Sequence, residues 1–132
     1  MYSSHGWNIT AKIMASKKEI IAVVGLGYVG LPIAIEFGKY YQTIGYDVSK
    51  KKINNYKKGK DVNKEIDSKS FLKSKLLSFT SSQRHISKAS IIIITVPTPI
   101  DKVRKPDLSY LSASSVTVGK NMSKGAIVIY ES

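Results

Sequence analysis

The 132-residue sequence contains no cysteine and only two histidines, His5 and His85. Without cysteine the chain forms no disulfide and offers no thiolate as a nucleophile or a metal ligand. Neither histidine has another ligand-type residue at a useful spacing, so we expect both to lie at the surface. These absences predict no metal site within this chain and exclude a cysteine nucleophile.

Long hydrophobic runs are also missing. No apolar stretch approaches the length needed to cross a bilayer. Residues 1–18 lack the continuous apolar segment of a secretory signal. We therefore expect a cytoplasmic protein with no membrane partner.

Acidic residues are scarce, with nine Asp and Glu against 21 Lys and Arg, which gives a net charge of +12. Only two of the basic residues are arginines, and the loose lysine clusters at 50–60, 64–75 and 102–105 have no regular aromatic interleaving. Nucleic-acid readers usually contact bases with arginine and stack them on aromatic rings. We therefore expect no nucleic-acid partner. The simpler interpretation of the lysines is a compositional bias on solvated faces, and such a basic surface can also help to gather an anionic cofactor and substrate.

The most informative segment that is present runs from Glu19 to Asp47. An apolar run over 20–24 predicts a buried strand, a helix is predicted over 29–40, and a second strand over 43–46 ends on the acid. Between the first strand and the helix, three glycines have the spacing G-x-G-x-x-G: Gly25, Gly27 and Gly30. A strand, this turn, a helix and an acid 20 residues past Gly27 together predict a dinucleotide site.

A physical reason explains why each position of the turn needs its residue type. Gly25 permits the sharp turn out of the strand, Gly27 lets a pyrophosphate approach the backbone, and Gly30 lets the helix lie close on the strand. The amides of the first helical turn then form an anion site. We expect Tyr28 and Val29 to pack against the cofactor at the mouth of the turn. The alternative is a glycine-rich turn that binds nothing.

Asp47 determines which dinucleotide is expected. A carboxylate at the end of the second strand accepts hydrogen bonds from both ribose hydroxyls, whereas the 2′-phosphate of NADP meets a like charge there. We therefore predict NAD. Lys50, Lys51 and Lys52 complicate this choice, because lysines can neutralise a phosphate, but a solvated first helical turn is the simpler interpretation for the first two.

The whole pattern predicts an α/β fold of Rossmann type, a doubly wound parallel sheet with helices on both faces in three αβα layers. The run 91–96 is β-branched with no polar face, which suits an inner parallel strand. After Asp47 we expect a helix that Ser49 caps and that runs through Tyr56, with Gly59 as its stop signal. The next expected elements are a partial helix over 61–74, a strand over 76–80, a short helix over 82–88 and the strand over 91–96. A helix capped by Asp107 is expected to run to Met122, and a strand is expected over 126–130.

The inner strand ends in the segment Thr95–Pro99, which we expect at the carboxyl edge of the sheet, where ligands bind in open α/β folds. Thr98 offers a hydroxyl at this rim, and we expect the backbone around Val96 to line the adenosine side. The alternative is a loop that the two prolines merely stiffen. Residues 1–18 are expected to form an arm of unknown structure, either packed through Trp7, Ile9 and Ile13 or helical on its own.

A more specific pattern than the glycine spacing extends over the chain. Its segments are GLGYVGLPIAIEFGK at 25–39, GYD at 45–47, TVPTPID at 95–101, PDLSYL at 106–111, TVGKNMSKG at 117–125 and IVIYES at 127–132. With these motifs the chain resembles the nucleotide-sugar 6-dehydrogenases of the UDP-glucose/GDP-mannose dehydrogenase family. TVPTPID with PDL is most similar to the branch that acts on UDP-N-acetylhexosamines, such as UDP-N-acetyl-glucosamine or -galactosamine 6-dehydrogenases, which make uronic acids for capsule or O-antigen polysaccharides.

The resemblance implies NAD as the cofactor and two successive oxidations of a sugar C6 alcohol to a carboxylate, the second through a cysteine located beyond Ser132. It implies that Asp47 binds the adenine ribose and that Lys52 and Thr98 lie beside the cofactor. The residues implied to hold the pyrophosphate are Gly25, Gly27, Tyr28, Val29 and Gly30.

We therefore expect residues 19–132 to be an NAD-binding Rossmann domain that ends after its fifth main strand, as a fragment of a longer enzyme. The fragment is expected to be inactive alone, with the UDP-sugar bound by a missing downstream domain and a homodimer formed by the full-length protein. The competing hypothesis is a non-catalytic NAD-sensing regulatory module.

Overall fold

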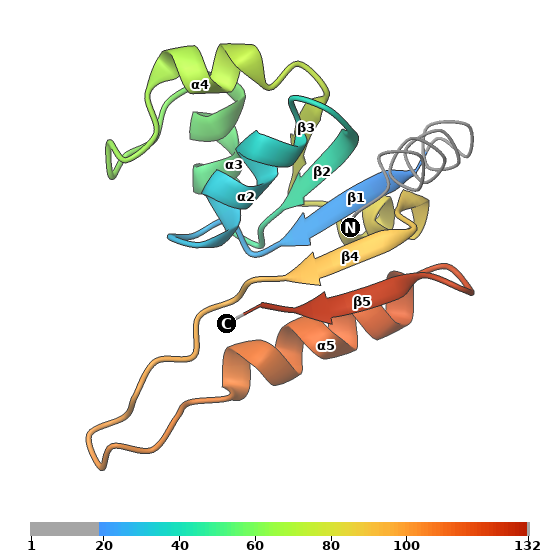
Figure 1. The fold of residues 1–132 in the computed structure, drawn as a ribbon. Helices are drawn as coiled ribbons and strands as arrows, with labels where there is room; N and C mark the ends of the chain where they lie inside the picture. Colours follow the sequence, from blue (N-terminus) through green and yellow to red (C-terminus); the bar gives the residue numbers. More distant parts are fainter. Residues whose placement is uncertain (1–18, 132) are drawn as a thin grey trace, which may run out of the picture.

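The computed structural model describes residues 19–131, which form a five-stranded sheet with helices on both faces (Figure 1). All neighbouring strands are parallel, and their spatial order is β3-β2-β1-β4-β5. The strands are β1 (Ile20–Val24), β2 (Gln42–Tyr46), β3 (Leu77–Thr80), β4 (Ile91–Ile94) and β5 (Ile127–Tyr130). The chain builds outward from β1 to β3 and then crosses to β4 on the other side of β1. The order therefore reverses between β1 and β4, which is where ligands bind in open sheets of this kind.

The central strands are apolar because both of their faces are covered. In β1, Ile21 and Val23 join the core on one face of the sheet, while Ala22 and Val24 join the core on the other. The strand β4 divides in the same way, with Ile93 on the first face and its neighbours on the second. This confirms the prediction that the isoleucine run is an inner strand covered by helices.

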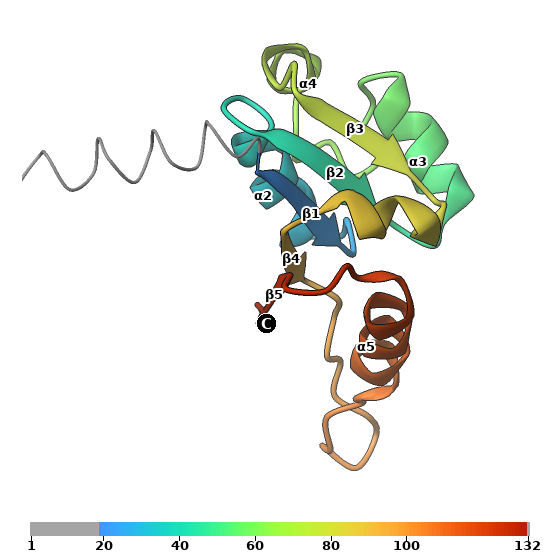
Figure 2. The same cartoon turned by 90° about the vertical axis from the view of Figure 1, so that its right-hand side faces the viewer.

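Two helical layers complete the fold, as Figures 1 and 2 show. Helices α2 (Gly30–Phe37) and α3 (Lys50–Lys57) cover one face, and α4 (Ser68–Lys73) adds Phe71 to that core. The 3₁₀-helix η1 (Gln83–Lys88) and α5 (Ser109–Asn121) cover the other face. The predicted three-layer Rossmann-type fold is confirmed.

Several predicted boundaries are confirmed and others shift. Ser49 caps α3, because its hydroxyl accepts a hydrogen bond from the Lys52 amide at 3.2 Å. The first predicted helix ends earlier than Tyr40, since the amides of Lys39 and Tyr40 bond three residues back to Glu36 and Phe37 and tighten the chain into a turn. Within the polar segment 61–74, only α4 is helical.

The expectation that Asp107 is the N-cap of the last helix is wrong by one position. The cap residue of α5 is Leu108, which offers no side-chain hydrogen bond. Asp107 still accepts a hydrogen bond from the Ser109 amide at 2.9 Å. Hydrogen bonding from the Ser109 side chain, and then from its amide, lowers the pKa of the Asp107 carboxyl. Pro106 lies in an isolated bridge to Ile100. The segment 97–108 thereby forms a projecting loop before the helix (Figure 2).

The expected arm over 1–18, with Trp7, Ile9 and Ile13, lies outside the described residues. Within the described part, β5 is the last strand on its side of the sheet. Its alternate side chains Ile127 and Ile129 are exposed, whereas Val128 packs toward α5. No helix in residues 19–131 is long and apolar enough to cross a membrane.

Candidate dinucleotide site

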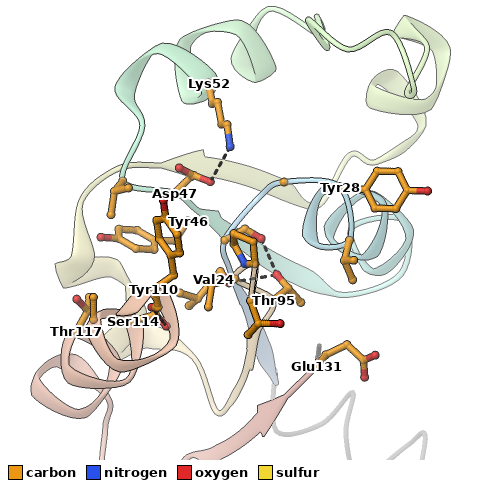
Figure 3. A pocket seen from close by; sticks show the side chains of 18 residues that line it. Val24, Tyr28, Tyr46, Asp47, Lys52, Thr95, Tyr110, Ser114, Thr117 and Glu131 are labelled. Atoms are coloured by element: carbon orange, nitrogen blue, oxygen red, sulfur yellow. Dashed lines mark hydrogen bonds and ion pairs between the residues drawn. The ribbon is translucent and has the colours of Figure 1, made fainter. Parts of the chain in front are cut away.

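A cavity of about 520 Å³ opens at the carboxyl ends of β1, β2 and β4, where the strand order reverses (Figure 3). The glycine turn after β1, the residues that end β2, the loop after β4 and one side of α5 supply its walls. Seven of the eight predicted site residues line it: Gly25, Gly27, Tyr28, Val29, Asp47, Lys52 and Thr98. Gly30 lies behind the turn and does not line the cavity.

The glycine turn has the geometry that its spacing predicts. Gly25 has a φ of +94°, and a Cβ there would lie 2.9 Å from Val96 Cγ1, so both the backbone and the packing exclude a side chain. A Cβ on Gly27 would meet no atom within 4 Å. Gly30 is the most crowded of the three, because a Cβ there would overlap the Gly25 carbonyl oxygen and the Thr95 hydroxyl. Gly27 therefore leaves space at the cavity, while Gly30 permits close packing behind it.

Helix α2 starts directly from this turn. Its hydrogen-bond ladder begins with the Leu31 amide, which donates to the Gly27 carbonyl at 3.1 Å. The amides that precede Leu31 therefore have no acceptor within the helix. Together with the positive end of the helix dipole, they form an environment that suits an anion at the cavity wall.

Asp47 lies at the cavity with 7% of its surface exposed, and it already accepts two main-chain hydrogen bonds. Its Oδ2 accepts from the Leu26 amide at 2.9 Å, and its Oδ1 accepts from the Ser49 amide at 2.8 Å. Lys52 Nζ lies 3.9 Å from Oδ2 (Figure 3). Each carboxylate oxygen has a further lone pair, so the group can accept hydrogen bonds from a ligand while it holds the turn and the start of α3.

The remaining predicted residues lie at the rim. Tyr28 is 80% exposed, and in Figure 3 its ring is directed away from Asp47. Val29 and Thr98 are also exposed. The side chains of Lys50 and Lys51 are exposed and do not line the cavity, in agreement with a solvated helical turn.

Tyr56 supports the glycine turn from outside the cavity, and the sequence patterns did not indicate it. It is buried in α3, and its hydroxyl donates a hydrogen bond to the Leu26 carbonyl at 2.8 Å. Burial, with smaller effects from Asp61, Asp47 and Glu65, raises the pKa of Tyr56 to about 12. The phenol therefore remains protonated at neutral pH and acts as a donor to the glycine turn.

Two polar residues at the strand ends, Thr95 and Glu131, line the cavity and were not predicted. Thr95 follows β4, is buried, and donates from Oγ1 to the Gly25 carbonyl at 2.6 Å. Glu131 follows β5 and lines the cavity. Both positions come directly after parallel strands, and the rule that carboxyl ends share one edge of the sheet identifies them. From α5, the cavity adds Tyr110, Ala113, Ser114 and Thr117.

The groups that line the cavity suit an organic ligand. In the part of the chain that the structure describes, no three His, Cys, Asp or Glu side chains are grouped to hold a metal ion. The combination present is a carboxylate, main-chain amides, hydroxyls and an apolar wall. It fits the ribose, pyrophosphate and base of a dinucleotide.

Comparison with known proteins agrees with this geometry. Residues 19–132 match the family model described as UDP-glucose/GDP-mannose dehydrogenase family, NAD binding domain. The chain is 49% identical over 112 residues to UDP-N-acetyl-D-glucosamine 6-dehydrogenase of Salmonella typhi, a match that covers 85% of this chain and 26% of that protein. It is 47% identical over 112 residues to Protein CapL of Staphylococcus aureus, with the same coverage.

Solved structures show the same architecture. A UDP-D-ManNAc dehydrogenase from Pyrococcus horikoshii matches with a TM-score of 0.75 and 38% identity, over 85% of this chain and 28% of that one. A ternary complex of GDP-mannose dehydrogenase from Pseudomonas aeruginosa matches with a TM-score of 0.74 and 26% identity, over 83% of this chain and 27% of that one. The chain spans about a quarter of the length of the curated relatives that it matches. Because the family model matches all of the sequence after its first 18 residues, the chain belongs to the UDP-glucose/GDP-mannose dehydrogenase family and carries its NAD-binding domain.

Proposed function

We propose that this chain is the NAD-binding domain, residues 19–132, of a nucleotide-sugar 6-dehydrogenase. The proposed substrate class is a UDP-N-acetylhexosamine, whose C6 alcohol is oxidised to a carboxylate for polysaccharide precursors, in a cytoplasmic enzyme that forms a homodimer. The carboxylate of Asp47 beside the glycine turn is the observation that carries this proposal. Similarity to relatives named as UDP-N-acetylhexosamine dehydrogenases supports the substrate class, and it favours the dehydrogenase over the NAD-sensing module.

The proposed roles of the residues follow from their positions. The amides at the start of α2, with Gly25, Gly27, Tyr28, Val29 and Gly30, hold the pyrophosphate. Asp47 accepts hydrogen bonds from the adenine ribose, Lys52 lies beside that carboxylate, and Thr98 contacts the cofactor from the rim. When bound, NAD accepts the hydride that leaves the carbon being oxidised.

The second oxidation that the family resemblance implies proceeds through a cysteine, and this sequence contains none. We therefore propose that the 132-residue chain binds NAD but does not oxidise a UDP-sugar by itself. The turn, Asp47 and the cavity are sufficient for the binding part of the function.

Cofactor choice is the direct test of the proposal. Isothermal titration calorimetry of the 132-residue chain is expected to give a Kd for NAD about tenfold or more below that for NADP. Repulsion between the 2′-phosphate and Asp47 is expected to weaken the binding free energy of NADP by roughly 1.4 kcal/mol or more. Circular dichroism confirms that the chain is folded in the same buffer. A folded chain that binds neither dinucleotide contradicts the proposal, and tighter binding of NADP contradicts the role of Asp47.

Gly27→Ala separates binding from folding. A Cβ at this position meets no protein atom within 4 Å, so we expect the melting temperature to stay near that of the unchanged chain. The methyl occupies space where the pyrophosphate approaches the backbone, and we expect the Kd for NAD to rise about tenfold or more. Gly119→Ala is the matched control, because a Cβ in α5 also meets no atom within 4 Å. Unchanged NAD affinity in Gly27→Ala would place the pyrophosphate elsewhere.

A further inference from the structure

Both main-chain polar groups of Gly25 have partners outside the glycine fingerprint, one from the main chain and one from a side chain. Its amide donates to the Tyr46 carbonyl at 2.9 Å, which continues the pairing of β1 with β2. Its carbonyl accepts the Thr95 hydroxyl at 2.6 Å. Thr95 is 5% exposed, so water has little access to replace this bond.

Both polar groups of Leu26 are held as well. Its amide donates to Asp47 Oδ2 at 2.9 Å, and its carbonyl accepts the Tyr56 hydroxyl at 2.8 Å. Leu26 is fully buried and Tyr56 is 6% exposed. Each main-chain N–H and C=O of the two residues before Gly27 therefore has a hydrogen-bond partner, and these partners lie at the end of β2, in α3 and at the end of β4.

This arrangement has a consequence for ligand binding, which rests on the proposed function. We propose that the hydroxyls of Tyr56 and Thr95 are positioning groups that hold the glycine turn in its pyrophosphate-binding shape before the cofactor arrives. Neither hydroxyl needs to contact the cofactor. They act through the Leu26 and Gly25 carbonyls, whose fixed orientation sets where the amides after them point.

The energetic reason is preorganisation. A turn that is already ordered loses little conformational entropy when a ligand binds. A flexible turn loses more, and this cost weakens the affinity. Only the pyrophosphate lies against the turn, while the adenosine is proposed to meet Asp47 at the end of β2. Removal of a hydroxyl is therefore expected to weaken ligands that carry a pyrophosphate and to spare adenosine.

The variants that test this are Tyr56→Phe, Thr95→Ala and Thr95→Ser in the 132-residue chain. Phenylalanine keeps the ring that packs against Phe71 and Phe79, and serine keeps the hydroxyl that alanine removes. The matched control is Thr43→Ala, since Thr43 is 2% exposed and donates to the Tyr41 carbonyl at 2.8 Å, yet it does not line the cavity. Dissociation constants for NAD and ADP come from calorimetry, the constant for adenosine from NMR titration, and melting temperatures from circular dichroism.

We expect Tyr56→Phe and Thr95→Ala each to raise the Kd for NAD and for ADP roughly fivefold, with less than a twofold change for adenosine. Thr95→Ser is expected to bind NAD and ADP like the unchanged chain. Thr43→Ala is expected to melt at a lower temperature with no change in the Kd values. Two results would overturn the positioning role: an equal loss of affinity for ADP and adenosine, or a lower melting temperature without any change in the Kd values. If one variant does not fold, the other decides. Absence of NAD binding in the unchanged chain is a different result, which overturns the proposed function itself.

Discussion

Gly30→Ala is expected to lower the free energy of unfolding by about 3 kcal/mol, at the upper end of what overpacking a core costs. The added Cβ overlaps the Gly25 carbonyl and the Thr95 hydroxyl, and a backbone carbonyl that is fixed in a turn cannot swing aside as a long side chain can. Helix α2 therefore has to move away from β1, which also breaks the anion site. Urea denaturation followed by circular dichroism measures the change.

Gly119→Ala again provides the control, because it places the same methyl in a helix where nothing lies within 4 Å. In a helix interior, alanine is expected to stabilise the chain by roughly 0.5–1 kcal/mol relative to glycine. The two substitutions are thus expected to change the free energy of unfolding in opposite directions. A Gly30→Ala chain as stable as the unchanged one would show that α2 does not need its close approach to the turn.

Asp47→Asn is expected to raise the Kd for NAD about tenfold to a hundredfold, because hydrogen bonds to a charged group contribute roughly 1.5–3 kcal/mol. The charge that repels a 2′-phosphate is lost while Lys52 remains nearby, so the preference for NAD over NADP is expected to narrow. An amide also has only one acceptor oxygen for two donors. One of the Leu26 and Ser49 amides consequently loses its partner, and the melting temperature falls as well.

Asp67→Asn separates these effects. Asp67 is an exposed N-cap whose carboxylate accepts from the Ser70 amide at 2.8 Å, and it does not line the cavity. We expect this variant to lose some stability but to keep the affinity for both dinucleotides. Calorimetry with NAD and NADP on the two variants gives the comparison. If the Asp47→Asn chain binds NAD as tightly as the Asp67→Asn chain does, the adenine ribose does not bind to the Asp47 carboxylate.

The local parts of the site were predictable because each rests on a short stretch of sequence. The turn from Gly25 to Gly30 needs only the residues that adjoin it, and Asp47 follows from the position where its own strand ends. The run at 91–94 has no polar face, which identifies an inner strand without knowledge of its neighbours. These are consequences of backbone conformation and of burial alone.

The supports of the turn were not predictable in the same way. Tyr56 contacts Leu26 across 30 residues, and Thr95 contacts Gly25 across 70. Such pairs depend on how α3 and β4 are placed by the sheet, and a tyrosine in a lysine-rich helix carries no local sign of a partner. The N-cap of α5 differs from the predicted residue for a related reason. The bridge between Ile100 and Pro106 shapes the loop that leads into α5, and local sequence does not indicate that bridge.

Within residues 19–131 the outer edge of β5 pairs with no other strand, and this edge affects how the isolated chain behaves in concentrated solution. An outermost strand with exposed isoleucines can accept a strand from another molecule, which is a route to aggregation. The chain's large positive charge opposes that encounter through mutual repulsion between copies. Dissolved salt weakens the repulsion, since charges are screened beyond about 8 Å at physiological ionic strength. Colloidal stability of the isolated chain therefore depends on ionic strength, with dilute buffer as the protective condition.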